Sequence, residues 1–317
     1  MSTANDTKFL PAVFLLTGIS GYEDVHVWIS IPFCLMYLSS ILGNSLILFI
    51  IKTDPNLHEP MCIFLSMLAI TDLGLSISTM PTILGIFWFN SRKITFNACF
   101  TQLFFIHSFS FIESSMLLLM AFDRLVAICV PLRYAFILTP SRIAKMGLIS
   151  LLRAVVLIFP LPILLKQYQY CQTNVLSHSY CLHQEVMKMA CSDIRVNSIY
   201  GLLIIVSTVG LDSLCILLSY LMILKTVLRI ATHAERLKAL NTCVSHVSAV
   251  LLFYTPMIGL SVMHRFGKNS SFTQILLGYI YMMVPPLMNP IVYSVKTKLI
   301  RARIIRSWPS LSSLAVV

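Results

Sequence analysis

The chain has 317 residues, of which 57% are apolar and 11% are charged, and its mean hydropathy is +0.85. This composition is typical of a membrane protein, and we expect no appended soluble catalytic domain. The formal net charge of +11 does not indicate nucleic-acid binding, because the basic residues are spread over the flanks of apolar segments without a nucleic-acid-binding signature.

The apolar residues are gathered into runs long enough to cross a bilayer as helices. Seven such runs lie at residues 27–51, 61–86, 98–122, 146–165, 198–224, 242–263 and 273–295. Lipid cannot satisfy exposed backbone groups, and the runs lack the alternating pattern of barrel strands. They therefore predict an all-α membrane protein, a seven-transmembrane helix bundle that forms one domain over residues 27–295.

The N-terminal tail, residues 1–26, holds one lysine and a short apolar stretch that Pro11 interrupts, which is a poor match to a cleaved signal peptide. We expect this tail to be retained. Most of the 23 lysines and arginines fall on the side of the C-terminus, so the positive-inside rule predicts an extracellular N-terminus. The glycosylation sequons at Asn5 and Asn269 both fall outside in this orientation.

Ionisable groups inside the predicted spans are hypotheses for functional sites, because charge in hydrocarbon is costly. Glu113 lies ten residues before Asp123, about 15 Å along a helix, and so near mid-membrane. With Asp72 and Asn289 it predicts a small acidic pocket for a hydrated cation such as sodium. The alternative is a protonated or hydrogen-bonded pair that stabilises packing. Asp212 has no evident partner in the sequence and is assigned no role.

Four cysteines fall on the predicted extracellular side, where disulfides form: Cys99, Cys171, Cys181 and Cys191. Four thiols permit three pairings, and the sequence does not choose among them. One of the three ties Cys99 to Cys181 in the long outer loop and leaves Cys171 with Cys191.

The stretch "SHSYCLHQ" of that loop, residues 177–184, brings His178, Cys181 and His183 close enough in sequence to suggest a metal site. We favour a disulfide-bonded loop with surface histidines, because oxidation removes the thiolate that a metal would need. No metal and no cofactor is expected.

The sixth run carries Pro256, which removes a backbone hydrogen bond and predicts a kink, and it ends on Arg265. The C-terminal tail, residues 296–317, alternates lysine and arginine with apolar residues at helical spacing. It predicts a short amphipathic helix that lies on membrane lipids of the cytoplasmic leaflet.

Several longer motifs occur in a fixed order: "GN" at 43, "LHEPM" from 57, "MAFDRLVAICVPLRY" from 120, "SY" at 219, "KALNTCVSH" from 238 and "PPLMNPIVY" from 285. Together they resemble the olfactory receptors, a family of rhodopsin-like G-protein-coupled receptors, from residue 1 to about residue 306. The loop motif "SHSYCLHQ" and "FFIH" before His107 resemble the class I, or fish-like, branch. The chain departs from the family's pattern at Leu125, where tyrosine is usual, and at Val130, where histidine is usual.

The resemblance implies an odorant receptor that activates a heterotrimeric G protein of the olfactory Gs type and raises cAMP. Asp123 and Arg124 would pair at the cytoplasmic end of the third span, and Arg124 would be freed for the G protein when the sixth span swings out. A receptor of the same fold for a metabolite outside the olfactory epithelium is the first alternative. A transporter or channel is the second, although no internal repeat supports it. No catalytic motif is present, so an enzyme is not expected.

The ligand class follows from which charges the spans carry. The seventh run has no lysine for a retinal Schiff base, and the outer half of the third run has no acid for an amine. Arg265 therefore predicts an anionic ligand such as a carboxylic acid. Ser261 lies one turn away on the same face, while His107 from the third run and Gln184 beside Cys181 are expected to complete the site. The alternative is that Arg265 only contacts water or lipid phosphate at the membrane boundary.

Overall fold

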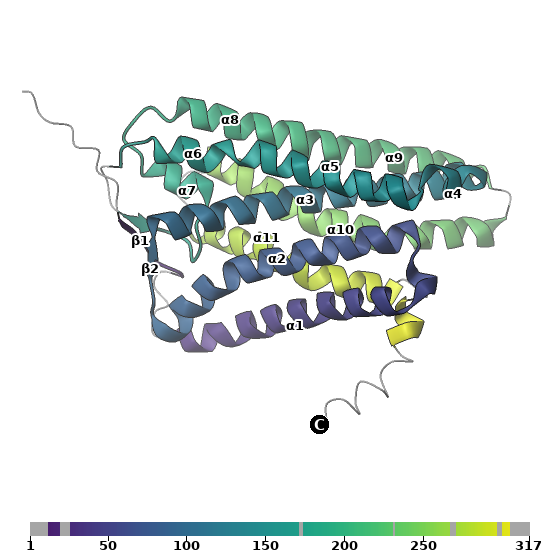
Figure 1. Ribbon diagram of the computed structural model, residues 1–317, viewed down its shortest axis with the longest axis horizontal. Coiled ribbons are helices and arrows are strands. Elements are labelled where there is room, and N and C mark those ends of the chain that lie inside the picture. The colour runs from purple at the N-terminus through teal and green to yellow at the C-terminus, as the bar shows by residue number, and fades with distance from the viewer. Residues whose placement is uncertain are drawn as a thin grey trace, which may run out of the picture.

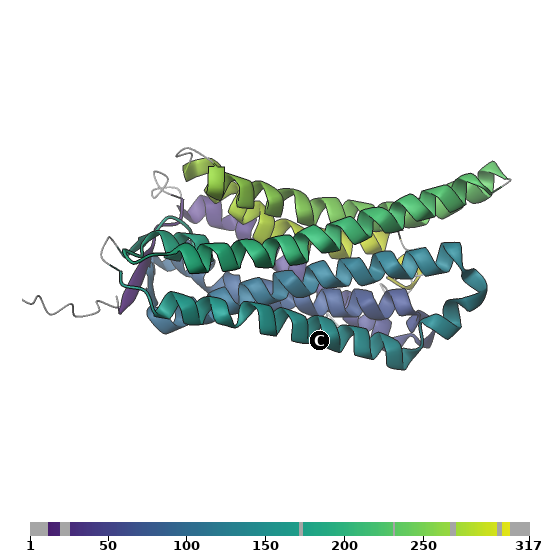
Figure 2. The same ribbon diagram turned by 90° about the horizontal axis from the view of Figure 1, so that it is seen from above.

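A computed structural model describes residues 12–19, 26–170, 174–230, 232–266, 271–296 and 300–304. Seven helical segments within these residues are long and apolar enough to span a membrane: Val27–Thr53, Pro60–Phe89, Phe96–Cys129, Pro140–Lys166, Arg195–Leu228, Ala234–Met263 and Phe272–Ser294. The predicted bundle is therefore confirmed. The helices run side by side along the long axis of the molecule (Figures 1 and 2).

The helices are α1 (His26–Thr53), α2 (Pro60–Phe89), α3 (Phe96–Cys129), α4 (Tyr134–Ile137), α5 (Pro140–Ile158), α6 (Pro160–Lys166), α7 (His183–Lys188), α8 (Arg195–Ile205), α9 (Leu211–Leu228), α10 (His233–Phe266) and α11 (Ser271–Lys296). The 3-10 turns Pro55–Leu57 and Pro131–Arg133 connect them, and the π-helical segment Val206–Gly210 joins α8 to α9. Residues 300–304 add a helical turn whose Ile300 is buried while Arg301 is exposed, as an amphipathic helix requires. The rest of the predicted tail helix lies outside the described residues.

The helix boundaries follow local chemistry. Proline begins α2, α5 and α6, where its missing N–H costs nothing. Thr95 caps α3 by accepting a hydrogen bond from the Ala98 backbone N–H at 3.4 Å. Asn90 ends α2 with φ of 50°, a left-handed conformation that asparagine tolerates. Each of these residues fixes where a span stops, and so which side chains come level with one another.

Helix α3 is the centre of the bundle and packs against α2, α5, α9 and α10. It approaches α2 closely because Gly74 has no side chain: a Cβ there would lie 2.4 Å from the ring of Phe109. The buried face of α3 is unusually polar and includes Ser108, Ser114 and Glu113. Those groups need partners on the neighbouring helices, which is what builds the sites described below.

A three-stranded sheet covers one end of the bundle, here called the sheet end (Figure 1). Its order is β2-β1-β3, with β1 (Val13–Leu16) in the middle, antiparallel to β2 (Lys93–Thr95) and parallel to β3 (Val175–Leu176). Phe14 of β1 is fully buried against the rings of Phe96 and Tyr170. The N-terminal strand thus joins the α2–α3 connection to the long loop before α7.

Candidate functional site

A cavity of about 500 Å³ lies at the sheet end, between α3, the α5–α6 pair, α7 and α8. Most of its wall is apolar and includes Phe111, Leu161 and Ile205. The polar side of the wall is made by His107, His183, Gln184, Lys188 and Ser198. This mixture of apolar walls with a few grouped polar side chains is typical of a small-molecule site.

Two buried polar atoms of this wall have no hydrogen-bond partner among the described residues: Nε2 of His107 and Oε1 of Gln184. His183 is held by Asn197, whose Oδ1 lies 3.0 Å from the His183 Nε2, and its ring centroid lies 6.3 Å from that of His107. Buried polar atoms normally find partners, so the two open atoms fit the polar head of a ligand.

The loop that carries Gln184 is fixed by a disulfide between Cys99 and Cys181, whose Cα atoms are 5.5 Å apart. The Cys181 N–H also donates to Oε1 of Gln102 at 2.9 Å. This pairing selects one of the three that the sequence permits. Cys191 is disulfide-bonded as well, while Cys171, its expected partner, lies outside the described residues. With Cys181 oxidised, the stretch around it has no thiolate for a metal, and no metal-binding group of three histidine, cysteine or acidic residues occurs within the described chain.

The structure brings together two of the four predicted ligand residues, His107 and Gln184, in the wall of this cavity. Ser261 of α10 lines a smaller cavity of about 220 Å³ beside Met257. Leu202 lines both cavities, so the two are neighbours. Arg265 belongs to α10, but its side chain lies outside the described residues, as do the predicted glycosylation sites Asn5 and Asn269.

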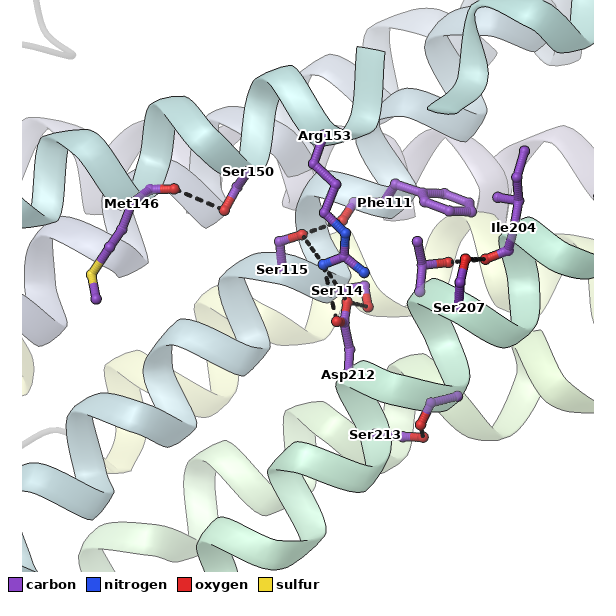
Figure 3. Close-up of polar contacts among 12 residues, drawn as sticks. Phe111, Ser114, Ser115, Met146, Ser150, Arg153, Ile204, Ser207, Asp212 and Ser213 are labelled. Atoms are coloured by element: carbon purple, nitrogen blue, oxygen red, sulfur yellow. Dashed lines mark hydrogen bonds and ion pairs between the residues drawn. The ribbon is translucent and has the colours of Figure 1, made fainter. Parts of the chain in front are cut away.

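An ion pair inside the bundle was missed by the sequence analysis (Figure 3). Arg153 of α5 donates from Nη1 to the Asp212 carboxylate at 3.0 and 3.1 Å. The interpretation that Asp212 lacks a partner is therefore wrong. The sequence does contain a signal for this pair. Arg153 and Asp212 carry opposite charges and lie in two successive spans, which are adjacent in a bundle.

The same pair is linked to two further helices. Ser114 of α3 donates to Asp212 at 2.8 Å, and its hydroxyl lies 2.8 Å from that of Tyr254 on α10. Nη1 of Arg153 lies 3.4 Å from the Ser115 hydroxyl, which donates to the backbone carbonyl of Phe111 at 3.0 Å (Figure 3). We call Arg153, Asp212, Ser114, Ser115 and Tyr254 the central cluster. It lies one helical turn from Phe111 in the cavity wall, and it connects α3, α5, α9 and α10.

The predicted acidic pocket is also assembled. The Asn289 amide of α11 donates to Asp72 at 3.0 Å and to Glu113 at 3.2 Å, and all three side chains are buried. The other oxygens, Asp72 Oδ1 and Glu113 Oε2, have no hydrogen-bond partner among the described residues. Two carboxylates this close cannot both stay charged without a cation. The geometry fits both hypotheses drawn from the sequence, a hydrated cation and a shared proton.

At the end opposite the sheet, the Arg124 guanidinium pairs with the buried Asp123 carboxylate, with Nε donating at 2.8 Å. Tyr134 donates its hydroxyl to the other oxygen of Asp123 at 2.7 Å. Burial and the neighbouring Asp123 charge raise the pKa of Tyr134 above its ordinary value. On the adjacent helices, the Tyr220 hydroxyl lies 2.6 Å from Nδ1 of His246 and joins α9 to α10. We call Asp123, Arg124 and Tyr134 the arginine latch.

Comparison with known proteins agrees with this arrangement. A sequence profile described as "Olfactory receptor" matches residues 33–310. Olfactory receptor 51G2 of Homo sapiens is 65% identical over 304 residues, covering 96% of this chain and 97% of that protein. Olfactory receptor 51G1 of Homo sapiens is 61% identical over 304 residues, covering 96% and 95%.

Among solved structures, squid rhodopsin is similar with a TM-score of 0.73 at 17% identity, covering 96% of this chain and 92% of that chain. At this identity the likeness concerns the fold alone. The family profile and the human relatives, by contrast, extend over nearly all of the chain. The chain therefore belongs to the olfactory receptor family of G-protein-coupled receptors, as a member of its class I branch.

Proposed function

We propose that this olfactory receptor binds small anionic amphiphiles, such as short straight-chain carboxylic acids, and activates a stimulatory G protein of the olfactory type to raise cAMP. Family membership makes it a multi-pass plasma-membrane receptor, not an enzyme, with a small-molecule ligand and a G-protein partner. The observation that supports the ligand class is the cavity, which sets open polar atoms of His107 and Gln184 against apolar walls.

The proposed ligand lies with its polar head between His107 and Gln184 and with its alkyl tail against Phe111 and Leu161. Arg265 is proposed as the anchor of the carboxylate, supported by its place one turn beyond Ser261 in α10. Ser261 itself lines the adjoining cavity, and it is proposed to donate a second hydrogen bond.

The proposed signal passes from the cavity to the opposite end through the central cluster. A ligand that contacts Phe111 acts on the turn of α3 that holds Ser115 and Ser114, and Ser114 bonds Tyr254 of α10. Pro256 lies two residues beyond Tyr254 and weakens the backbone of α10 there. A shift at Tyr254 can therefore move the far half of α10 away from α9, and the freed Arg124 then contacts the G protein.

The proposed orientation places the sheet end outside the cell and the arginine latch in the cytosol. The excess of lysine and arginine on the latch side supports it. Staining of intact cells for an epitope placed before residue 1 tests it, and an epitope accessible only after permeabilisation contradicts it.

The function is tested by a cAMP screen in cells that express the receptor with an olfactory-type stimulatory G protein. Short and medium carboxylic acids are compared with their methyl esters, alcohols, aldehydes and amines. We expect responses to acids, and a rise of roughly ten- to a hundredfold in their half-maximal concentration for Arg265→Ala, because a charge-assisted hydrogen bond is lost. Responses to amines alone, or to esters as well as acids, would contradict the proposed ligand class.

A further inference from the structure

Helix α7 places a lysine in the wall of the ligand cavity. Lys188 lines the cavity together with His107 and Gln184. Among the described residues of that wall, it is the one lysine or arginine. The sequence did not single out this residue, because only the fold of α7 brings it to the cavity.

Lys188 already has an anionic partner on the same helix. Its Nζ lies 2.8 Å from Oε1 of Glu185, three residues earlier. The two side chains differ in how freely they can move, because that of Lys188 is 50% exposed and that of Glu185 only 10%. The carboxylate is therefore the fixed half, and the long lysine stem is the half able to turn toward another partner.

The surroundings of Lys188 fit a second carboxylate. His107 Nε2 and Gln184 Oε1 lie in the same wall without a hydrogen-bond partner among the described residues. The histidine ring and the amide each donate or accept according to tautomer and amide orientation, so both are able to bind an anionic head beside the ammonium group. The apolar wall around Phe111 then receives the tail.

We propose that Glu185 is a built-in counter-ion of the ligand site: it holds Lys188 in the empty receptor, and the carboxylate of an anionic ligand replaces it, so that Lys188 contacts the ligand directly. This rests on the proposed function and adds a second cation to the proposed anchor Arg265. The exchange conserves the number of ion pairs, so it selects acids over esters at a modest gain in affinity.

The surroundings of Glu185 include His178, whose pKa responds to the glutamate charge. Burial lowers the pKa of His178 in the loop before α7, and the Glu185 charge acts against this and raises that pKa. Because the net shift is downward, His178 supplies no full counter-charge, and the release of Lys188 has an electrostatic cost. Because Lys188 has to leave Glu185 before it can bind a ligand, Glu185 lowers the receptor's sensitivity to acids.

The test uses hexanoate and methyl hexanoate on cells with matched surface expression, and it depends on two variants that neutralise opposite halves of the pair. Lys188→Gln should raise the half-maximal concentration of hexanoate roughly tenfold, because the direct ion pair is lost. Glu185→Gln should lower it several-fold, because the lysine no longer has to be released. If the pair only stabilises α7, both variants should shift the half-maximal concentration of hexanoate in the same direction, and that result overturns the proposal.

Matched controls separate the local effect from net charge and from misfolding. Asp193→Asn neutralises the acid of an exposed pair with Arg195, whose atoms are 3.7 Å apart, and neither residue lines the cavity. Asp193→Asn should leave the half-maximal concentration of hexanoate unchanged. A decrease equal to that of Glu185→Gln overturns the proposal. The double variant Glu185→Lys with Lys188→Glu keeps an ion pair on α7 but places the negative charge at the cavity. It should therefore lose the cAMP response to hexanoate at normal surface expression. Retained potency overturns the proposal.

The inference and the proposed function fail separately. If wild type answers no carboxylate in the screen, the proposed ligand class is wrong. The proposal about Lys188 then still requires Glu185→Gln to gain a response to hexanoate, and the absence of that gain overturns it.

Discussion

At the residue scale, the central cluster explains how this bundle carries full charges within its spans. Asp212 is buried, and it accepts hydrogen bonds from both Arg153 and Ser114. Because the pair is mutually neutral and hydrogen-bonded, its cost in a low-dielectric medium is far smaller than that of either charge alone. Arg153 and Asp212 are therefore tolerated in the bundle only as a pair.

Removing one member should therefore be worse than removing both. We expect Asp212→Asn to leave the Arg153 charge without its counter-ion, to cost about 3 kcal/mol or more, and to reduce surface expression strongly. The double variant Arg153→Met with Asp212→Leu should recover much of the expression, since no unpaired charge remains. Flow cytometry of intact cells measures both, and normal staining of Asp212→Asn would show that the pair does not stabilise the bundle.

The arginine latch offers a change of a single atom. Tyr134→Phe removes the hydroxyl that donates to Asp123 at 2.7 Å and leaves the ring in place. Hydrogen bonds to charged groups contribute about 1.5 to 3 kcal/mol. The resting state should therefore become less stable relative to the active state, and ligand-independent cAMP should rise several-fold. The comparison is basal cAMP per receptor at the surface, with Arg124→Ala as the inactive reference. Unchanged basal cAMP would remove Tyr134 from the latch.

At the element scale, strand β1 is the piece that ties the sheet end together. It pairs with β2 on one side and β3 on the other, and Phe14 anchors it among aromatic rings. Because β3 lies in the loop that carries Gln184 and α7, the strand also supports the roof of the ligand cavity.

We expect Phe14→Ala to destabilise this end by about 3 to 5 kcal/mol, as truncation of a fully buried phenylalanine usually does. Thermal unfolding of the purified receptor in detergent should show a lower Tm, and responses to acids should weaken. Val13→Ala, at a half-buried position of the same strand, is the control and should change little. Equal Tm values for the two variants would mean that β1 is not a structural support.

The π-helical segment Val206–Gly210 lies directly before α9. A π segment adds a residue to the turn and rotates the helix that follows. It therefore helps to set the direction of Asp212, two residues after the segment ends. Hydropathy gives no warning of such a segment, which is one reason why the partner of Asp212 was not found from the sequence.

At the scale of the whole molecule, hydropathy located all seven spans, but it missed the ends of several of them. The structure begins α10 at His233 instead of residue 242, because a helix continues into the polar region as long as its backbone bonds do. The acidic pocket was predictable, since Asp72, Glu113 and Asn289 each stand out as polar groups in apolar runs. The cavity positions of Lys188 and His183 were not, although the neighbouring Gln184 was, because the direction of their side chains depends on α7, a six-residue helix that hydropathy does not reveal.

The three polar sites form one connected path along the bundle. The cavity touches the central cluster through Phe111, and Glu113 of the acidic pocket precedes Ser114 of the central cluster in α3. Helix α3 then continues to Asp123 and Arg124. A ligand at the sheet end therefore contacts the same helix, α3, that carries Asp123 and Arg124 at the far end.

The central claim is that the cavity at the sheet end holds the activating ligand, and a change of its volume tests this most directly. Gly201 lines the cavity, and a Cβ there would make only an ordinary contact with His183, at 3.6 Å. Gly201→Ala should therefore fold and respond to hexanoate much as wild type does. Gly201→Leu should fold as well but fill part of the cavity that the ligand would occupy. We predict that its half-maximal concentration for hexanoate rises roughly tenfold or more at equal surface expression, since the lost apolar burial exceeds about 1.4 kcal/mol. A hexanoate response of Gly201→Leu equal to that of wild type would contradict the account.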